Sequence, residues 1–363
     1  MTKTDIVIVI GFIAWLIVGY YLGRQSPKPL PPKRRHRRTP QEVAEARQAE
    51  ALTKAKSVMP IKPVDGTPLW DYMKERHRTH IMRLQNPIAD PLTWTKDPII
   101  QKYSFCNVFR ELDRTTVWID QHIRQPFADH PNLWFLLCLA RQINWAPTLD
   151  QLLKEAGLPE WHPDRVLEIL RERHAQGIKT YTGAYIIAAD GGKHATYEDK
   201  PPFTVHKVLD PLWHANPVDQ LTNTSIQQAT ECLTQFHGFG AFLAYEVATD
   251  LRHTRYLREA PDVMTWANPG PGAKRGLNRL VGRTLGATLR TERAIAEMRQ
   301  LLADSASHLP GWVHAGATDF SGAQTAPVLE LRDIEHSLCD LDKYLRVVNG
   351  EGAPRSLFTP TRD

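Results

Sequence analysis

Cysteine is scarce in this sequence, because the 363 residues include only four, which lie far apart and form no CxxC pair. This spacing argues against a disulfide framework and against the usual zinc sites. We therefore expect no metal and no cofactor, and a reducing compartment suits the chain best. The four positions are Cys106, Cys138, Cys232 and Cys339.

A phosphate-binding loop of the form Gly-x4-Gly-Lys-Ser/Thr is also absent from the sequence. Such a loop surrounds nucleotide phosphates with backbone amides and a lysine. Without it, we find no basis for an ATP-dependent kinase activity of this polypeptide.

An excess of positive charge is missing from most of the chain, although the overall pI is near 8.9. Eight of the 45 Lys and Arg residues lie within residues 1–40, together with one of the 40 acidic residues. The rest of the chain holds 37 basic and 39 acidic residues. Its bulk composition therefore does not by itself indicate a nucleic-acid partner.

The N-terminus carries an uncharged apolar run, residues 6–23, which is eighteen residues long. That length is near the minimum for a transmembrane helix. The basic run at 33–38 predicts, by the positive-inside rule, a cytoplasmic body. We therefore expect residues 6–23 to anchor the protein to the inner face of the membrane. A cleaved signal peptide is the alternative.

Composition divides the chain into four parts. Residues 1–24 hold the predicted transmembrane anchor, 25–65 a basic, proline-rich linker with an exposed helix, 66–358 the folded body and 359–363 a tail.

Within the body, apolar residues recur at spacings of three and four, which is the helical period, so the predicted fold class is mainly α. The helical segments are 104–124, 131–143, 148–156, 163–175, 226–235, 241–251, 273–281, 291–303 and 333–348. A small β-hairpin is predicted from residues 179–187 and 202–205.

The segment Phe236–Gly240 lies between two predicted helices, 229–235 and 241–251. In a helix-hairpin-helix motif, glycines at these positions let the backbone approach a phosphate, which the amides of the next helix bind. We interpret His237, Gly238 and Gly240 as DNA-binding residues. A plain αα-hairpin, in which the glycines only end and restart helices, is the alternative.

Positive charge gathers directly after this hairpin, since residues 250–293 hold nine Lys and Arg residues against four acids. Such a patch would bind phosphates in a salt-sensitive manner, and we predict that Arg252 and Arg255 contact DNA. Within it, a Gly/Pro-rich loop at 268–276 opens into a helix, where Lys274 and Arg275 could hold a second anion. A solvated arginine face and a purely geometric turn are the alternatives.

Two further segments combine polar residues in a way that suits a site. On one predicted helix, four polar residues share a stripe at spacings of three and four: Asn107, Arg110, Asp113 and Arg114. A buried stripe needs partners, such as a flipped base or its phosphate, whereas an exposed face with weak ion pairs is the alternative. On the last helix, Glu335 and His336 point apart, so we expect at most one to face a site.

The hairpin followed by Asp262 resembles the helix-hairpin-helix class of DNA glycosylases, in which a corresponding aspartate supports chemistry at a flipped nucleotide. This resemblance implies a catalytic role for Asp262. Phe242 stands where bifunctional members of that class carry a lysine, which argues against a Schiff-base lyase.

A second resemblance covers the body from about Trp70 to Phe358. Several strings carry it: Asp97 to Arg114, Thr182 to Tyr185, Gly238 to Gly240 with Ala244-Tyr245-Glu246, Thr249-Asp250-Leu251, Gly270 to Gly276, and Glu335 to Cys339 with Lys343-Tyr344. Together they look like the helical domain associated with 5-hydroxymethyluracil DNA kinases. That domain is shared with the phage α-glutamyl/putrescinyl thymine pyrophosphorylases, or amino acid:DNA transferases.

This second resemblance implies a glycosylase-like fold and hypermodification of thymine-derived bases in DNA. An amine or amino acid would displace the phosphate or pyrophosphate of a phosphorylated 5-hydroxymethyl group. The implied partners are DNA, the small amine or amino acid, and a 5-hydroxymethyluracil DNA kinase. A membrane-tethered DNA-binding module without catalysis and a monofunctional glycosylase are the alternatives.

Roles for individual residues follow from combining the motifs with their chemistry. We expect Asp262 or Asp113 to act as a base or an orienting carboxylate. The residues expected to bind the substrate and its anionic substituent are Asn107, Arg110, Arg114, Lys274 and Arg275.

Overall fold

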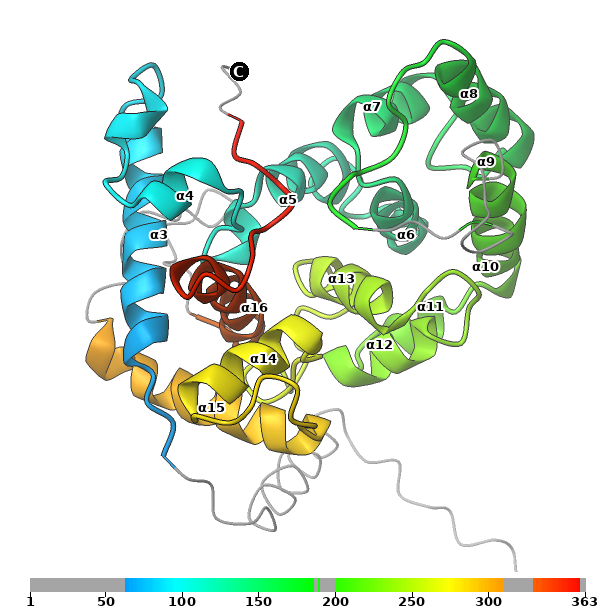
Figure 1. Cartoon of the computed structure of the whole chain (residues 1–363). Helices are drawn as coiled ribbons and strands as arrows, with labels where there is room; N and C mark the ends of the chain where they lie inside the picture. The colour runs from blue at the N-terminus through cyan, green and yellow to red at the C-terminus, as the bar shows by residue number, and fades with distance from the viewer. Residues whose placement is uncertain (1–62, 186–188, 190–199, 310–328, 360–363) are drawn as a thin grey trace, which may run out of the picture. The chain divides into compact units, whose positions relative to one another are not determined.

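The computed structural model describes residues 63–185, 189, 200–309 and 329–359. Helices dominate this part of the chain, which contains no β-strand and a single isolated bridge between Tyr103 and Leu357 (Figure 1). The predicted mainly α fold class is therefore confirmed.

Helices and helical turns follow one another along this part of the chain. In order, they are α3 (Thr67–Gln85), η1 (Pro91–Thr93), α4 (Pro98–Lys102), η2 (Arg110–Leu112), α5 (Arg114–Ile119), η3 (Asp120–Arg124), α6 (Leu133–Ile143), α7 (Ala146–Glu155), α8 (Pro163–Ala175), α9 (Lys200–Pro202), η5 (Phe203–Leu209), α10 (Asp210–Ala215), α11 (Val218–Leu221), α12 (Ile226–Leu233), α13 (Ala241–Leu251), α14 (Pro271–Leu280), α15 (Thr291–His308) and α16 (Leu331–Val348).

Helix α6 is buried along its entire length, and α13 packs against it. A helix that is apolar on nearly all sides belongs in a core, because no face of it gains from contact with water. Arg141 and Gln142 are the polar residues of α6, and both are buried like its apolar residues. Both polar side chains therefore need partners inside the protein.

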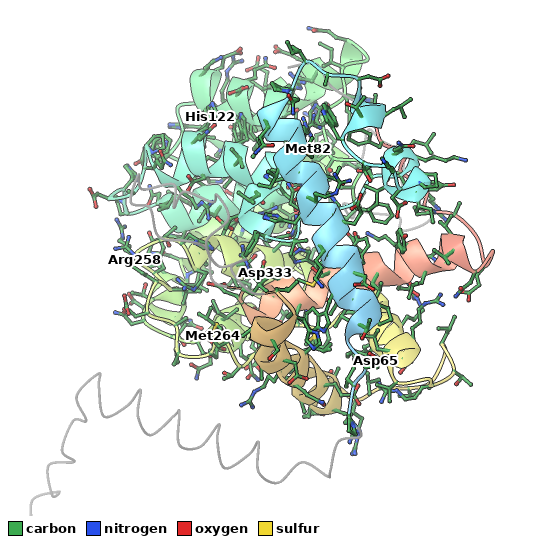
Figure 2. All side chains as sticks on the ribbon, turned by 90° about the vertical axis from the view of Figure 1, so that its left-hand side faces the viewer. Asp65, Met82, His122, Arg258, Met264 and Asp333 are labelled. Atoms are coloured by element: carbon green, nitrogen blue, oxygen red, sulfur yellow. The ribbon has the colours of Figure 1, made fainter. Side chains whose placement is uncertain are left out.

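Helix α16 contacts α3, α14 and α15, and Figure 1 shows it between α3 and α14. Figure 2 looks onto α3, with Asp65 just before its N-terminal end and Met82 near its C-terminal end. The close approach of α14 to α16 depends on two glycines. A Cβ atom at Gly272 would collide with the Cys339 side chain, and one at Gly276 with the backbone of Leu338.

The predicted β-hairpin is wrong in its second strand. Residues 202–205 belong to α9 and η5, where Phe203, Val205 and Val208 are buried. A short apolar run has no clear period, so the pattern cannot distinguish a strand from a buried helical turn. Residues 179–185 of the first strand form no strand either, and residues 186–187 lie outside the described residues.

The predicted helix over 104–124 is also wrong in its first half. Residues 104–109 form no helix, η2 is a single 3-10 turn, and α5 begins at Arg114. Polar side chains bond to the backbone here: the Asn107 amide donates to Asp113 Oδ1 over 2.7 Å, and Asn107 Nδ2 donates to the Leu112 carbonyl over 2.6 Å. Such bonds compete with those of a continuous helix.

The predicted pair of helices around residues 236–240 is present as α12 and α13, which pack against each other. Helix α13 has its predicted bounds. Helix α12 begins at the first residue of the predicted segment 226–235, and so before residue 229, where the first helix of the hairpin is predicted to begin, because Ser225 and Gln228 form a capping box at its N-terminus. In the turn, Gly238 adopts a φ of +80°, and a Cβ atom there would collide with Val208.

The predicted transmembrane span at 6–23 and the exposed helix after it lie outside the described residues. Among the helices that the structure describes, none is both long and apolar enough to cross a bilayer.

Candidate functional site

A chain of five charged side chains connects turn η2 to helices α13 and α6. Arg110 donates from Nη2 to Glu246 Oε2 over 2.7 Å, and its Nη1 pairs with Asp113. Beyond Glu246, Arg141 lies 3.4 Å away and forms a two-point ion pair with Asp250, with N–O distances of 2.6 and 2.8 Å. We call these residues the Arg110–Asp250 chain. Its charges alternate in sign, so each one has an opposite neighbour.

The chain of charges runs from a partly open end to a closed end. The Arg110 side chain is 20% exposed, that of Glu246 10% and that of Asp250 1%. Only the Arg110 end can therefore meet a ligand without unfolding the core. A guanidinium at such a position suits a phosphate or carboxylate, which it can bind through two parallel hydrogen bonds.

Two carboxylates near this end have pKa values shifted in opposite directions. Burial alone would raise the pKa of Glu246, but Arg110 and Arg141 outweigh it and hold the pKa below its usual range. Burial raises the pKa of Glu335 to about 7, although a hydrogen bond from the Gly270 amide (3.1 Å) opposes the shift. A carboxyl group that titrates near neutral pH can exchange protons with a substrate, whereas Glu246 remains charged.

Helix α13 carries two residues of the Arg110–Asp250 chain and the exposed Phe242 on one side. Phe242, Glu246 and Asp250 lie four residues apart, which places them along one stripe. Phe242 is 53% exposed at the N-terminal end of this stripe. Asn268 fixes the adjoining loop by donating from Nδ2 to the Ala241 carbonyl over 2.9 Å. The loop that carries Gly270 thus lies beside the start of α13.

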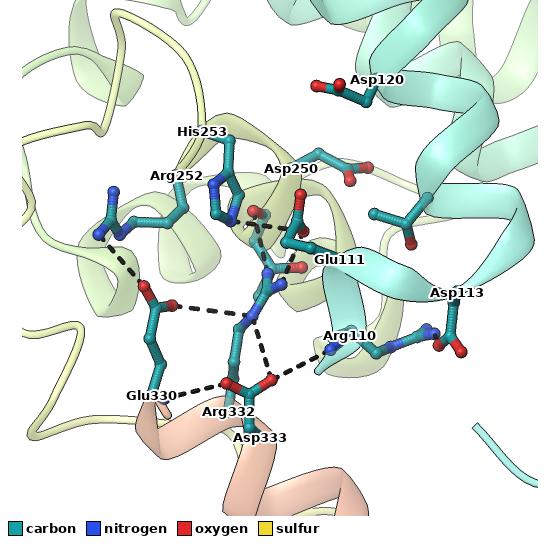
Figure 3. Close-up of polar contacts among 12 residues, drawn as sticks. Arg110, Glu111, Asp113, Asp120, Asp250, Arg252, His253, Glu330, Arg332 and Asp333 are labelled. Atoms are coloured by element: carbon teal, nitrogen blue, oxygen red, sulfur yellow. Dashed lines mark hydrogen bonds and ion pairs between the residues drawn. The ribbon is translucent and has the colours of Figure 1, made fainter. Parts of the chain in front are cut away.

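A second cluster of buried charges surrounds Arg332 and is shown in Figure 3. Glu111 accepts hydrogen bonds of 2.6 Å from both Arg332 and Arg124. Burial alone would raise the pKa of Glu111, but His253, Arg124 and Arg332 outweigh it and hold this pKa well below its usual range. Burial lowers the pKa of His253 to about 3, so this ring is neutral at physiological pH. Glu330 Oε1 accepts a hydrogen bond of 3.2 Å from Arg252 Nη2. We call these residues the Arg332 cluster, and through the Glu111–Arg332 hydrogen bond it connects η2 to the start of α16.

The structure brings three of the four residues of the predicted polar stripe together, although they do not share a helix. Asn107 accepts a 2.8 Å hydrogen bond from Arg76 through Oδ1, and its carbonyl lies 2.8 Å from His336 Nε2. Asp113 joins Arg110 to the Asn107 backbone. Arg114 is exposed at the first position of α5.

The other predicted substrate-binding and catalytic residues have structural partners. Lys274 Nζ donates to Thr291 over 3.2 Å, and Arg275 Nε to the buried Asp342 over 2.8 Å. Asp262 accepts from the first-turn amides of α12, at Ile226 (2.7 Å) and Gln227 (2.9 Å). Burial outweighs these bonds and raises the pKa of Asp262. Its oxygens thus cap a helix, and its catalytic role stays a prediction.

The predicted DNA-binding residues fall into two groups. His237 and Gly240 are exposed in the α12–α13 turn, whereas the Gly238 carbonyl accepts a 3.1 Å hydrogen bond from Gln142. Arg252 is tied to Glu330, and Arg255 donates to the carbonyls of Ala128 (3.0 Å) and His130 (2.8 Å). DNA binding by these residues stays a prediction.

The basic run after the hairpin is partly neutralised inside the fold. Five of its arginines form ion pairs with acidic residues: Arg252, Arg275, Arg279, Arg283 and Arg293. Arg258 and Arg290 are exposed, and Figure 2 labels Arg258. The local excess of basic residues therefore does not produce an equally basic surface.

These observations define a helical protein whose polar centre combines a partly exposed arginine with two carboxylates of opposite pKa shift. Comparison with known proteins identifies its class. The sequence matches the family described as "5-hmdU DNA kinase, helical domain" over residues 66–353. The chain belongs to this family, which confirms the predicted resemblance to the helical domain associated with 5-hydroxymethyluracil DNA kinases.

A curated relative from Bacillus phage SP10, named "5-hmdU DNA kinase", is 27% identical over 237 residues. The alignment covers 59% of this chain and 36% of the relative, so the chain spans about a third of the relative's length. No solved structure matches the chain at a significant level.

Sequence reasoning missed the role of Arg141, although a signal was present. This arginine stands in the apolar run Leu133–Ile143, where a buried charge demands an ionic partner. Its partner Asp250 lies 109 positions further along the chain, which no local spacing reveals.

Proposed function

We propose that this protein modifies thymine-derived bases in DNA by transferring an amine or amino acid onto a phosphorylated 5-hydroxymethyluracil. Membership of the 5-hmdU DNA kinase helical-domain family and the name of the phage relative support a substrate of this class. The observation that carries the proposed reaction type is the partly exposed Arg110 guanidinium held by Glu246, with Glu335 within electrostatic reach of both side chains. The sequence lacks the nucleotide-binding loop Gly-x4-Gly-Lys-Ser/Thr, so this motif gives no support for a kinase activity of the chain itself.

In the proposed reaction, the amine nitrogen forms a bond to the 5-methylene carbon of the base. The carbon–oxygen bond to the phosphoryl group breaks, and phosphate or pyrophosphate leaves with the electron pair. Arg110 binds the leaving phosphoryl oxygens at the open end of the Arg110–Asp250 chain, where its side chain is 20% exposed. Glu246 and Asp113 hold the guanidinium in place.

Glu335 is the proposed proton acceptor. With a pKa of about 7, part of its population is ionised at neutral pH and can take the proton that the amine loses as the C–N bond forms. Glu246 cannot share this role equally, because two arginines stabilise its charged form. Arg114, Lys274 and Arg275 remain candidates for contacts with the DNA backbone or the leaving group.

A direct test is mass spectrometry of nucleosides. DNA that contains phosphorylated or pyrophosphorylated 5-hydroxymethyluracil would be incubated with the protein and a series of amines and amino acids, then digested. We expect a new nucleoside whose mass equals a 5-aminomethyl adduct, and its loss in Arg110→Ala. Abasic sites would instead favour base excision, and phosphorylation of 5-hydroxymethyluracil DNA by ATP would favour a kinase.

A further inference from the structure

Phe242 is an exposed aromatic side chain at the start of α13, with 53% of its surface accessible. An aromatic ring in this position loses the free energy that burial would provide. Most other large apolar side chains of α13 are buried, among them Leu243, Tyr245 and Val247. The exposure of Phe242 is therefore a local exception that the packing of α13 does not explain.

The ring of Phe242 is held in place from one side. Tyr185 contacts it edge to face, with ring centroids 5.2 Å apart and an interplanar angle of 69°. Tyr185 is itself fixed, because its hydroxyl donates to the Arg141 carbonyl over 2.6 Å. A partly exposed ring that a neighbouring side chain already holds is suited to stacking, since less conformational freedom remains to be lost.

The position of Phe242 relative to the charged site is set by the helix. Glu246 lies one turn further along α13, where helix geometry places its Cβ atom about 5–6 Å from that of Phe242. Arg110 donates a hydrogen bond to Glu246. Phe242 and Glu246 therefore share one side of α13, and a pyrimidine stacked on Phe242 would lie on the same side of this helix as the Arg110 end of the charge chain.

We infer that Phe242 is the surface on which the target pyrimidine stacks when it leaves the DNA helix. Enzymes that act on a base in duplex DNA must extrude it, and stacking on an aromatic side chain offsets part of the cost. The inference rests on the proposed function in taking a DNA base as the ligand. It requires neither the amine nor the leaving group.

Binding measurements without any amine test this inference. Two single-stranded oligonucleotides would be compared, one with 5-hydroxymethyluracil at a central position and one with an abasic site there. Phe242→Ala should bind the first oligonucleotide about tenfold to a hundredfold more weakly than the wild type does, and the abasic one equally well. Phe242→Tyr should keep the preference, whereas Phe242→Leu should lose most of it.

The matched control is Met264→Ala, which also truncates an exposed apolar side chain (42% exposed; Figure 2) and should change neither affinity. Photocrosslinking with 5-iodouracil at the central position should place the adduct on Phe242. The inference is overturned if the wild type binds both oligonucleotides equally, or if Phe242→Leu matches Phe242→Tyr. These results are independent of nucleoside transfer, so either proposal can fail while the other stands.

Discussion

Glu246 Oε2 accepts a 2.7 Å hydrogen bond from Arg110 Nη2, which joins helix α13 to turn η2 across 136 positions of the sequence. This contact connects the irregular polypeptide segment between α4 and α5 to the buried residues of the Arg110–Asp250 chain. The ion pair that stabilises this part of the fold therefore also contains the arginine that we propose binds the leaving group.

Glu246→Gln should destabilise the protein by about 1–3 kcal/mol, because it removes the anion that Arg110 and Arg141 share, while Asp113 and Asp250 still pair with them. Urea unfolding followed by circular dichroism measures the change. The matched control is Glu168→Gln, whose partner Arg165 is at the surface (side chains 57% and 39% exposed) and which should cost less than about 1 kcal/mol. Equal costs for the two variants would contradict a buried, coupled chain of charges.

Glu335 should make stability depend on pH. Its folded-state pKa of about 7 lies above the ordinary value of 4.5, so the fold favours the protonated group. This contribution, about 3 kcal/mol, is fully present below pH 4.5 and is lost as pH rises through 7. Other groups titrate in the same window, so the quantity to measure is the difference between wild type and Glu335→Gln. That difference should fall between pH 5 and 8, and a constant difference would show that Glu335 has an ordinary pKa.

The glycines of α14 should be required for helix packing. Gly272→Ala and Gly276→Ala each place a methyl group against α16 and should cost at least about 1–3 kcal/mol. Gly286→Ala is the control, because a Cβ atom there meets nothing within 4 Å. Thermal unfolding compares the three variants. If all three behave alike, the packing of α14 on α16 is looser than the structure shows.

Asp262→Asn distinguishes a helix cap from a catalytic carboxylate. The amide oxygen can still accept one of the two amide hydrogen bonds at the start of α12, so we expect a loss near 1 kcal/mol in stability. The rate of nucleoside transfer should stay within about twofold of the wild type. A loss of a hundredfold or more, typical of a missing general base, would instead confirm the predicted catalytic role.

Much of the fold could be predicted because its helices carry their own signals. Helix α13 has apolar residues at helical spacing and a glycine before its first turn, and its bounds agree with the prediction. Turn η2 could not be predicted, since the side chains of Asn107 and Asp113 bond to backbone groups that a helix would otherwise use. The spacing of apolar residues alone does not reveal that side chains compete with the helix for these backbone groups.

The candidate site was only partly predictable for a similar reason. The sequence predicts that Arg110 and Asp113 share a polar stripe, and they do lie together. Their connection to Glu246, Arg141 and Asp250 depends on how α6 and α13 pack, which sequence spacing does not encode. Glu335 was one of two adjacent candidates, and only the structure reveals the burial that raises its pKa.

The most direct test of the proposed chemistry is the single-turnover rate of nucleoside transfer between pH 6 and 9. The amine must be poorly basic, so that its own protonation does not change over this range. For the wild type, the rate should rise about fivefold from pH 6 to pH 7, about twofold more above pH 7, and then level off, following the ionised fraction of Glu335. Glu335→Gln should be at least a hundredfold slower, with a flat profile. An unchanged rate and profile in Glu335→Gln, or no transfer by the wild type, would contradict the account.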